Sequence, residues 1–301
     1  MCEVIDIFRT FELEIDEKFH EKTVKAVLKS HFGLSEHMIT QLKKGDGITV
    51  NGKKEFVNMV LKTGDFLKLT LFEDGSENIP ADDIPLDILY EDEDILAVNK
   101  PYDMPTHPSI HHYHGTLANG VVNYYKDLPF TFRAVTRLDR DTSGVVIIAK
   151  NAICCDKLSR QIQSGEFCKQ YVAVCVGVPK EKSGRIDAPI LREKEGIIKR
   201  CIDEKGKKAV SDYEVLEEFG GLSLVRLFPK TGRTHQLRLH LSYIGTPIYA
   251  DFLYGQDVEN QRIRLHCEKV SFFHPFSGER LEISAKLPDD MDLKTIKEQG
   301  F

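Results

Sequence analysis

An acidic stretch at residues 76–95 divides this chain into two unequal parts. It holds eight Asp or Glu residues and no Lys or Arg, whereas the formal charge of the whole 301-residue chain is only −6. Two prolines, a glycine and a serine lie at residues 74–87, and this turn-forming, charged composition is typical of an exposed linker. We therefore predict a small unit at residues 1–75, an acidic linker at 76–87 and a larger domain at 88–301, with few contacts across the linker.

The small unit has the sequence pattern of a compact α/β fold. Residues 21–32 and 35–44 each show the apolar spacing of a helix, and each is followed by a glycine that can end it. A tight turn at Asn51-Gly52 follows a short apolar strand and precedes another. A core of two helices and a small sheet is the expected result.

The larger domain is dominated by short apolar strands, several of which are joined as hairpins. We expect strands at residues 133–138 and 145–149, on either side of a polar turn. Helices are expected to begin at Thr116, Asn151 and Thr234, whose side chains can cap the first turn. The predicted fold class is α+β, with a mixed, mostly antiparallel sheet flanked by helices.

Composition narrows the classes of protein further. The apolar share of 41% and charged share of 29% are typical of globular proteins. No apolar run reaches the roughly 20 residues that span a bilayer, and the N-terminus lacks the order of a secretory signal, so we expect a cytoplasmic protein without membrane contact. The cysteines are scattered, and histidines 111, 112 and 114 lie in a loop without nearby Cys or carboxylates, so no metal site is expected.

The polar turn after residues 133–138 contains the first candidate for chemistry. Asp139 immediately follows apolar residues and lies between Arg137 and Arg140, a setting that keeps a carboxylate ionised. The residues from Asp141 onward are ordinary turn formers. The pattern alone leaves two interpretations of Asp139 open, a catalytic carboxylate and a simple ion pair.

A second candidate site lies at residues 230–240. A glycine-containing loop runs into a helix start, where free backbone N–H groups and the helix dipole favour an anion. Arg238 projects from that helix on the same face as His235 and could pair with a carboxylate or a phosphate. A solvated helix end is the alternative interpretation.

Tyr171 is the third candidate. It alternates with Lys169 and Ala173 on one face of the strand expected at residues 167–176. A tyrosine in this position is either half-buried packing or a stacking surface for a nucleobase.

Taken together, these stretches resemble the RluA-type pseudouridine synthases, which modify uridines in ribosomal or transfer RNA. The family pattern H-R-L-D-x-x-T-S-G, K-x-Y-x-A and T-G-R-x-H-Q-[IL]-R-x-H is matched in order at residues 136–144, 169–173 and 231–240. The stretch VNKPYDMPTHPS at 98–109 is similar to the opening segment of that family. The resemblance covers about residues 88–285 and implies the pseudouridine synthase fold, with a catalytic cleft and no cofactor.

The resemblance also implies roles for individual residues. Asp139 corresponds to the catalytic carboxylate, Arg238 to its ion-pair partner, and Tyr171 to the side chain that packs on the target uracil. Thr136 departs from the family, which usually has histidine there. The expected substrate is ribosomal RNA or tRNA, bound by a monomer through further polar side chains: Arg137, Lys230, Arg233 and His235.

Residues 12–70 resemble, more loosely, a small RNA-binding domain first seen in a ribosomal small-subunit protein. The resemblance implies RNA contacts from Lys43, Lys44 and Lys53. The arginines usual in the second helix of that domain are absent at residues 36–38.

Two alternative functions remain at this point. A non-catalytic RNA-binding or ribosome-associated protein would explain the small unit but not the ordered set of Asp139, Tyr171 and Arg238. A glycosidic-bond hydrolase would use Asp139 with Asp141. Two residues apart in a turn, these carboxylates are poorly placed to flank a scissile bond, which requires a separation of roughly 5–9 Å.

Overall fold

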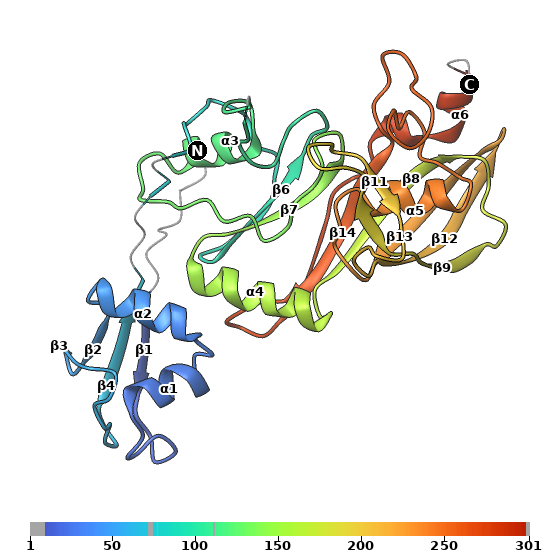
Figure 1. The fold of residues 1–301 in the computed structure, drawn as a ribbon. Coiled ribbons are helices and arrows are strands. Elements are labelled where there is room, and N and C mark those ends of the chain that lie inside the picture. The colour runs from blue at the N-terminus through green and yellow to red at the C-terminus, as the bar shows by residue number, and fades with distance from the viewer. Residues whose placement is uncertain (1–9, 72–74, 77, 111, 299–301) are drawn as a thin grey trace.

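The computed structural model describes all residues except 1–9, 72–74, 77, 111 and 299–301. The described chain contains a small four-stranded sheet near the N-terminus, a large nine-stranded sheet that follows it, and a separate two-stranded sheet. Figure 1 shows the small unit in blue, beside helix α4 and apart from the strands of the large sheet. Among the described residues, no helix is long and apolar enough to cross a membrane.

The small unit packs two helices on a four-stranded antiparallel sheet with the strand order β1-β4-β2-β3. Thr23 and Ser35 cap its helices, each accepting a backbone N–H with the side-chain oxygen. The Asn51-Gly52 turn has positive φ at both residues, as the sequence predicts for this dipeptide. The elements are β1 (Thr10–Glu14), α1 (Val24–Ser30), α2 (Glu36–Lys44), β2 (Ile48–Val50), β3 (Lys53–Lys54) and β4 (Phe66–Thr70).

The large sheet is mixed and mostly antiparallel, which confirms the predicted fold class. Its strands follow the order β5-β6-β7-β14-β8-β13-β12-β9, with β15 paired to β14, and the β7–β14 pair is parallel. The strands are β5 (Ile88–Glu91), β6 (Ile95–Lys100), β7 (Ser143–Ala149), β8 (Cys168–Val176), β9 (Ser183–Asp187), β12 (Val210–Phe219), β13 (Leu222–Pro229), β14 (Leu265–Phe273) and β15 (Arg280–Ser284). A separate hairpin consists of β10 (Ile190–Arg192) and β11 (Arg200–Ile202).

Helices accompany this sheet, and two of their caps agree with the sequence. Thr116 and Asn151 accept N–H groups of the first turns of α3 and α4, and Gly165 ends α4 in a left-handed conformation. The helical elements are α3 (Leu117–Tyr124), α4 (Ala152–Ser164), α5 (Gln236–Tyr243), the 3₁₀ turn η1 (Asp289–Met291) and α6 (Leu293–Glu298).

The expected strand at residues 133–138 is wrong. This segment makes a single isolated bridge, Ala134 to Ile148, and otherwise lacks regular structure. On this edge of β7, β14 pairs only with Ser143 and Gly144, and residues 133–136 bond to Ile147 and Ala149 beyond it. The Thr136 hydroxyl, rather than a backbone carbonyl, accepts the Ile147 N–H, so no regular ladder continues from the bridge. The segment therefore reaches the polar turn as an irregular chain.

The acidic segment between the two units differs from the expected exposed linker. Its apolar side chains Ile84 and Leu86 lie against Gly120 of α3, where an added methyl group would come within 3.1–3.2 Å of them. Asp82 accepts the Gly115 N–H, and the Asn119 side chain donates to a carbonyl of the same segment. Every second side chain of this segment thus packs on the large domain, and the side chains between them remain exposed.

Contacts also join the small unit directly to the large domain. Ile153 of α4 is buried in the apolar core of the small unit, and the ring of Phe11 lies 4.9 Å from that of Phe276. These contacts place the small unit against the start of α4 and the turn between β14 and β15 (Figure 1). The small unit and the large domain are therefore in more extensive contact than the sequence predicts.

Candidate active site

The three candidate stretches line one cavity of about 390 Å³. The turn after residues 133–138 supplies one wall, β8 a second, and the loop leading into α5 the third. The lining residues that could act on a ligand are Arg137, Asp139, Lys169, Tyr171, Arg233, His235 and Arg238.

Asp139 is held in place through the residue before it. The Thr106 hydroxyl donates to the Leu138 carbonyl at 3.0 Å, and the Leu138 N–H donates back to the same hydroxyl at 3.3 Å. The Asp139 side chain is about one-third exposed, which leaves its carboxylate open to the cavity. At the end of the turn, Gly144 has φ of +112°, and a side chain there would collide with the backbone of Cys267 at 2.2 Å.

Lys100 fixes the other side of this turn. Its ammonium group is buried and donates to the carbonyls of Pro101, Met104 and Arg140 at 2.7–3.1 Å. Burial lowers the pKa of Lys100 to about 7, although the nearby Asp141 and Asp139 carboxylates oppose this effect. The sequence contained Lys100 in a matched motif, but it gave no indication that the side chain ties the motif to the Asp139 turn.

Arg238 connects two carboxylates. Its guanidinium forms two hydrogen bonds of 2.7 Å with Asp251, and its Nη1 lies 3.9 Å from Asp139 Oδ2. Burial acts to lower the pKa of Arg238, but hydrogen bonding to Asp251 and the charges of both carboxylates raise it, so the guanidinium remains charged. The predicted proximity of Arg238 to Asp139 is present, but the tight partner is Asp251.

Sequence reasoning missed Asp251. Its side chain is fully buried and also accepts the N–H groups of Leu253 and Tyr254. These bonds hold the carboxylate in position to orient Arg238 toward the cavity. The residue lies outside the matched motifs, so no sequence signal pointed to it.

Helix α5 begins differently from the prediction. Its N-cap is His235, in a left-handed conformation with φ of 56° and no side-chain cap, rather than Thr234. The side-chain carbonyl of Gln236 accepts hydrogen bonds from Thr231 and from the Arg233 N–H, and this holds the loop instead. His235 therefore faces the cavity, where its Nδ1 lies 2.9 Å from the Tyr254 hydroxyl and burial lowers its pKa.

Tyr171 lies on β8 with its side chain almost fully buried. Burial raises the pKa of Tyr171 well above its ordinary value, and the neighbouring Cys267 thiol and the Asp139 charge act in the same direction. In the free protein its hydroxyl is therefore a neutral phenol, which can pack on a base but cannot begin as a proton acceptor.

The other predicted RNA-binding residues occupy different places. Arg137 and Arg233 are exposed and line the cavity. Lys230 is not among the lining residues, and its ammonium lies 3.4 Å from Asp212. The lysines predicted in the small unit are exposed on α2 and β3, away from the cavity: Lys43, Lys44 and Lys53.

The arrangement does not favour a two-carboxylate hydrolase. Asp141 is bonded to Arg140 at 3.1 Å and is not among the described residues that line the cavity. Of those lining residues, Asp139 is the one that carries a carboxylate.

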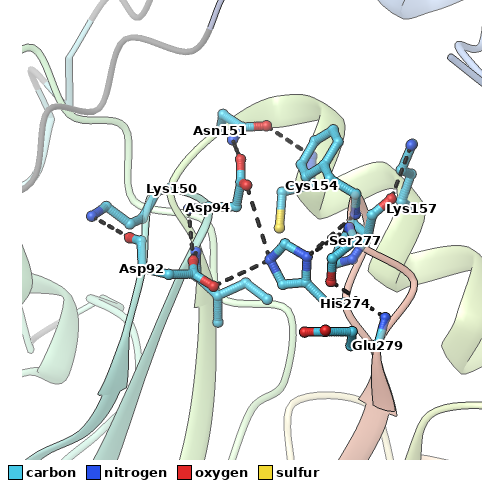
Figure 2. Close-up of polar contacts among 12 residues, drawn as sticks. Asp92, Asp94, Lys150, Asn151, Cys154, Lys157, His274, Ser277 and Glu279 are labelled. Atoms are coloured by element: carbon cyan, nitrogen blue, oxygen red, sulfur yellow. Dashed lines mark hydrogen bonds and ion pairs between the residues drawn. The ribbon is translucent and has the colours of Figure 1, made fainter. Parts of the chain in front are cut away.

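A second polar cluster lies where the turn between β5 and β6 meets the turn between β14 and β15 (Figure 2). His274 Nε2 lies 3.1 Å from Asp92 and 4.0 Å from Asp94, and Asp94 accepts a hydrogen bond from the Asn151 amide. Lys150, which is buried, donates to the Asp92 carbonyl at 2.7 Å. The cluster thus joins both turns to the end of β7 and the start of α4.

Within the described part of the chain, Asp92, Asp94 and His274 form the one group of three side chains close enough to hold a metal ion. The geometry opposes this role. His274 Nδ1 accepts N–H groups from Phe276 and Ser277, so the ring proton lies on Nε2 and faces the carboxylates (Figure 2). A metal ion on Nε2 would require that proton on Nδ1, where two donors already point.

Replacing Asp92 with asparagine is expected to lower stability in a pH-dependent way. Burial opposes the charged form, but hydrogen bonds from the His274 imidazole, the Tyr90 hydroxyl and two backbone N–H groups lower the pKa of Asp92 from 3.8 to about 2. Because the folded pKa is the lower one, Asp92 stabilises the fold above about pH 4, and this is lost as pH falls toward 2.

Urea unfolding should therefore give a free energy of unfolding about 2 kcal/mol lower for Asp92→Asn than for wild type at pH 7. This difference should become smaller as the pH falls from 4 to 3. A difference that stays constant over this range would contradict the assignment.

Comparisons with known proteins agree with this geometry. Residues 94–243 match the family model described as RNA pseudouridylate synthase. The chain is 40% identical over 272 residues to the uncharacterized RNA pseudouridine synthase YjbO of Bacillus subtilis, covering 88% of this chain and 95% of that protein. It is 36% identical over 245 residues to ribosomal large subunit pseudouridine synthase D of Vibrio parahaemolyticus, covering 76% and 75% of the two chains.

Among solved structures, human RNA pseudouridylate synthase domain containing 1 superimposes with a TM-score of 0.59 at 27% identity, covering 73% of this chain and 96% of that one. Together with the sequence relatives, this similarity shows that the chain belongs to the RluA-type family of RNA pseudouridine synthases.

Proposed function

We propose that this protein converts uridines of ribosomal RNA to pseudouridine, with Asp139 as the catalytic carboxylate. The observation that supports this proposal is the position of Asp139, which faces the cavity beside Arg238 and opposite Tyr171. The relatives named for the large ribosomal subunit favour ribosomal RNA over tRNA. The cavity is lined by one chain, so a monomer suffices, and this substrate would place the protein in the cytoplasm.

The reaction is an isomerisation. The bond from uracil N1 to the sugar breaks, uracil carbon 5 bonds to the same sugar carbon, carbon 5 loses its proton and N1 gains one. A carboxylate can assist as a nucleophile at the sugar or as a base on it, and Asp139 must be ionised for either role. Arg238, oriented by Asp251, places its guanidinium 3.9 Å from that carboxylate.

The target base must leave its stack to enter the cavity, at a cost of a few kcal/mol. Arg137 is exposed at the wall of the cavity and is suited to occupy the vacated space. Arg233, His235 and, farther out, Lys230 would contact the RNA backbone, which positions the RNA without reading its sequence.

We further propose that the small unit adds affinity for RNA through Lys43, Lys44 and Lys53. These side chains are exposed, and the unit is held against the large domain by its contacts with Ile153 of α4 and Phe276 of the turn between β14 and β15. A fixed unit would extend the RNA-binding surface of the enzyme in a defined direction.

Tyr171→Phe is expected to bind RNA within about twofold of wild type but to form little pseudouridine. The ring that packs on the uracil remains, whereas the hydroxyl is lost. Because this hydroxyl begins as a neutral phenol, it can act only as a relay, passing its own proton to another base as it accepts the proton of carbon 5. We expect this step to come late, when loss of that proton restores the conjugation of the ring.

The Tyr171→Phe variant should therefore break the original glycosidic bond and accumulate a rearranged or protein-bound uracil, which mass spectrometry of the quenched reaction would detect. Release of tritium from carbon 5 at the wild-type rate would leave Tyr171 only a packing role.

The substrate proposal is tested by mapping pseudouridine in ribosomal RNA and tRNA from a strain that lacks the gene. One or more ribosomal positions should revert to uridine and be restored by the wild-type gene but not by the gene encoding Asp139→Asn. Losses confined to tRNA would contradict ribosomal RNA as the substrate.

A further inference from the structure

Lys169 is a cation in the active-site cavity without a counter-ion. It lies on β8, two residues before Tyr171, and lines the same cavity. Among the described residues, no Asp or Glu forms an ion pair with it, and its ammonium has no hydrogen-bond partner. The other lysine close to the Asp139 turn, Lys100, is by contrast bonded to three carbonyls.

The surroundings of Lys169 do not compensate for its burial. Desolvation lowers its pKa, and Cys267 on the adjacent strand is the one titratable neighbour that acts on it. Burial raises the pKa of Cys267 to about 12, so that neighbour is a neutral thiol. Lys169 is partly buried, and a partly desolvated ammonium without an anion is unfavourable, which is the arrangement expected where a ligand supplies the negative charge.

The remaining walls of the cavity also favour an anion. Arg137 and Arg233 add positive charge, so that with Lys169 and Arg238 the cations outnumber the two carboxylates, Asp139 and Asp251. Gly232 lies against Lys169, and a methyl group added to it would be 3.8 Å from the ammonium. The first turn of α5, which follows this loop, has no side-chain cap, so its N–H groups add to the positive potential.

We propose that Lys169 binds a backbone phosphate next to the nucleotide whose base packs on Tyr171. Both side chains leave the same face of β8, about 6.6 Å apart along the strand, so one nucleotide can reach both. Uridine has no charge of its own, and the phosphate is the anion that RNA brings into the cavity. This proposal rests on the proposed function, because it assumes that uridine in RNA enters the cavity.

The test compares Lys169→Met with wild type in binding a short RNA that contains the uridine identified by the mapping. Loss of one charge-assisted contact should weaken binding about tenfold. The slope of log affinity against log salt should become shallower by about one. Lys169→Arg should restore most of the RNA affinity and most of the salt slope. As a matched control, Lys286→Met removes a lysine that is 86% exposed and paired with Asp289 outside the cavity. This control should change neither the RNA affinity nor the salt slope.

A neutral methylphosphonate in place of the phosphate on the 5′ or the 3′ side of the target uridine makes the test specific. One of the two replacements should weaken binding to wild type about tenfold but weaken binding to Lys169→Met no further, since the contact is already lost. Additive losses at both positions, or an unchanged salt slope in Lys169→Met, would overturn the proposal.

Thermal unfolding distinguishes this role from a structural one. Because the partly desolvated charge of Lys169 has no counter-ion in the free protein, Lys169→Met should unfold at the same temperature as wild type or higher. A variant with both weaker binding and a lower unfolding temperature would indicate that Lys169 supports the fold instead. The readouts are binding and stability rather than turnover, so a failure of this proposal is distinguishable from a failure of the proposed function, which the mapping itself reports.

Discussion

Asp139→Asn is expected to abolish pseudouridine formation, lowering turnover by at least about a thousandfold, while leaving the protein folded. Asparagine keeps the shape of the side chain but removes the charge, so it can act neither as a nucleophile nor as a base. The positions of Leu138 and Thr106 depend on backbone and hydroxyl groups that the substitution does not touch. The measurement is single-turnover release of tritium from RNA labelled at carbon 5 of uridine.

Asp141→Asn is the matched control for this experiment. Asp141 is bonded to Arg140 and does not line the cavity, so its replacement should reduce turnover only mildly. An Asp139→Asn variant that retained a tenth of the wild-type rate would exclude Asp139 as the catalytic carboxylate.

Arg238→Met is expected to lose activity by on the order of a hundredfold or more, and to lose stability as well. The activity falls because Asp139 no longer has a cation beside it. The stability falls by about 3–5 kcal/mol because Asp251, which is fully buried, is left as an unpaired carboxylate. Arg238→Lys should also be impaired, since an ammonium cannot reproduce the two-point contact with Asp251.

A double variant separates the two effects of Arg238. Adding Asp251→Asn to Arg238→Met removes the unpaired charge but keeps a side-chain oxygen for the N–H groups of Leu253 and Tyr254. Urea unfolding should show recovery of most of the lost stability, while tritium release stays as low as in Arg238→Met. Recovery of activity together with stability would show that Arg238 acts on the fold alone.

Local rules predicted much of the fold correctly. Thr116 and Asn151 cap helices, as predicted, because the side-chain oxygen and the N–H groups that it accepts lie within one turn of chain. The strand expected at residues 133–138 failed because only its first residues bond to β7, and the Thr136 side chain then accepts the Ile147 N–H in place of a backbone carbonyl. His235 replaced Thr234 as the N-cap because the Gln236 side chain holds the preceding loop.

The site could be predicted only where its residues lie within sequence motifs. Asp139, Tyr171 and Arg238 were found in this way, and they line one cavity. Asp251 could not be found, because its role comes from a buried contact made across 13 residues. Lys169 was visible as a strand residue beside Tyr171, but its lack of a counter-ion depends on what β14 and the α5 loop place around it.

The cavity is expected to isomerise uridine in RNA rather than to hydrolyse its glycosidic bond or only to bind RNA. The direct measurement is incubation of the wild-type protein with ribosomal RNA labelled with tritium at carbon 5 of uridine, followed by mass analysis of the digested RNA. We predict one tritium released for each pseudouridine formed, with no free uracil and no gain of water. Free uracil from the RNA, or tight binding with all tritium retained, would contradict the assignment.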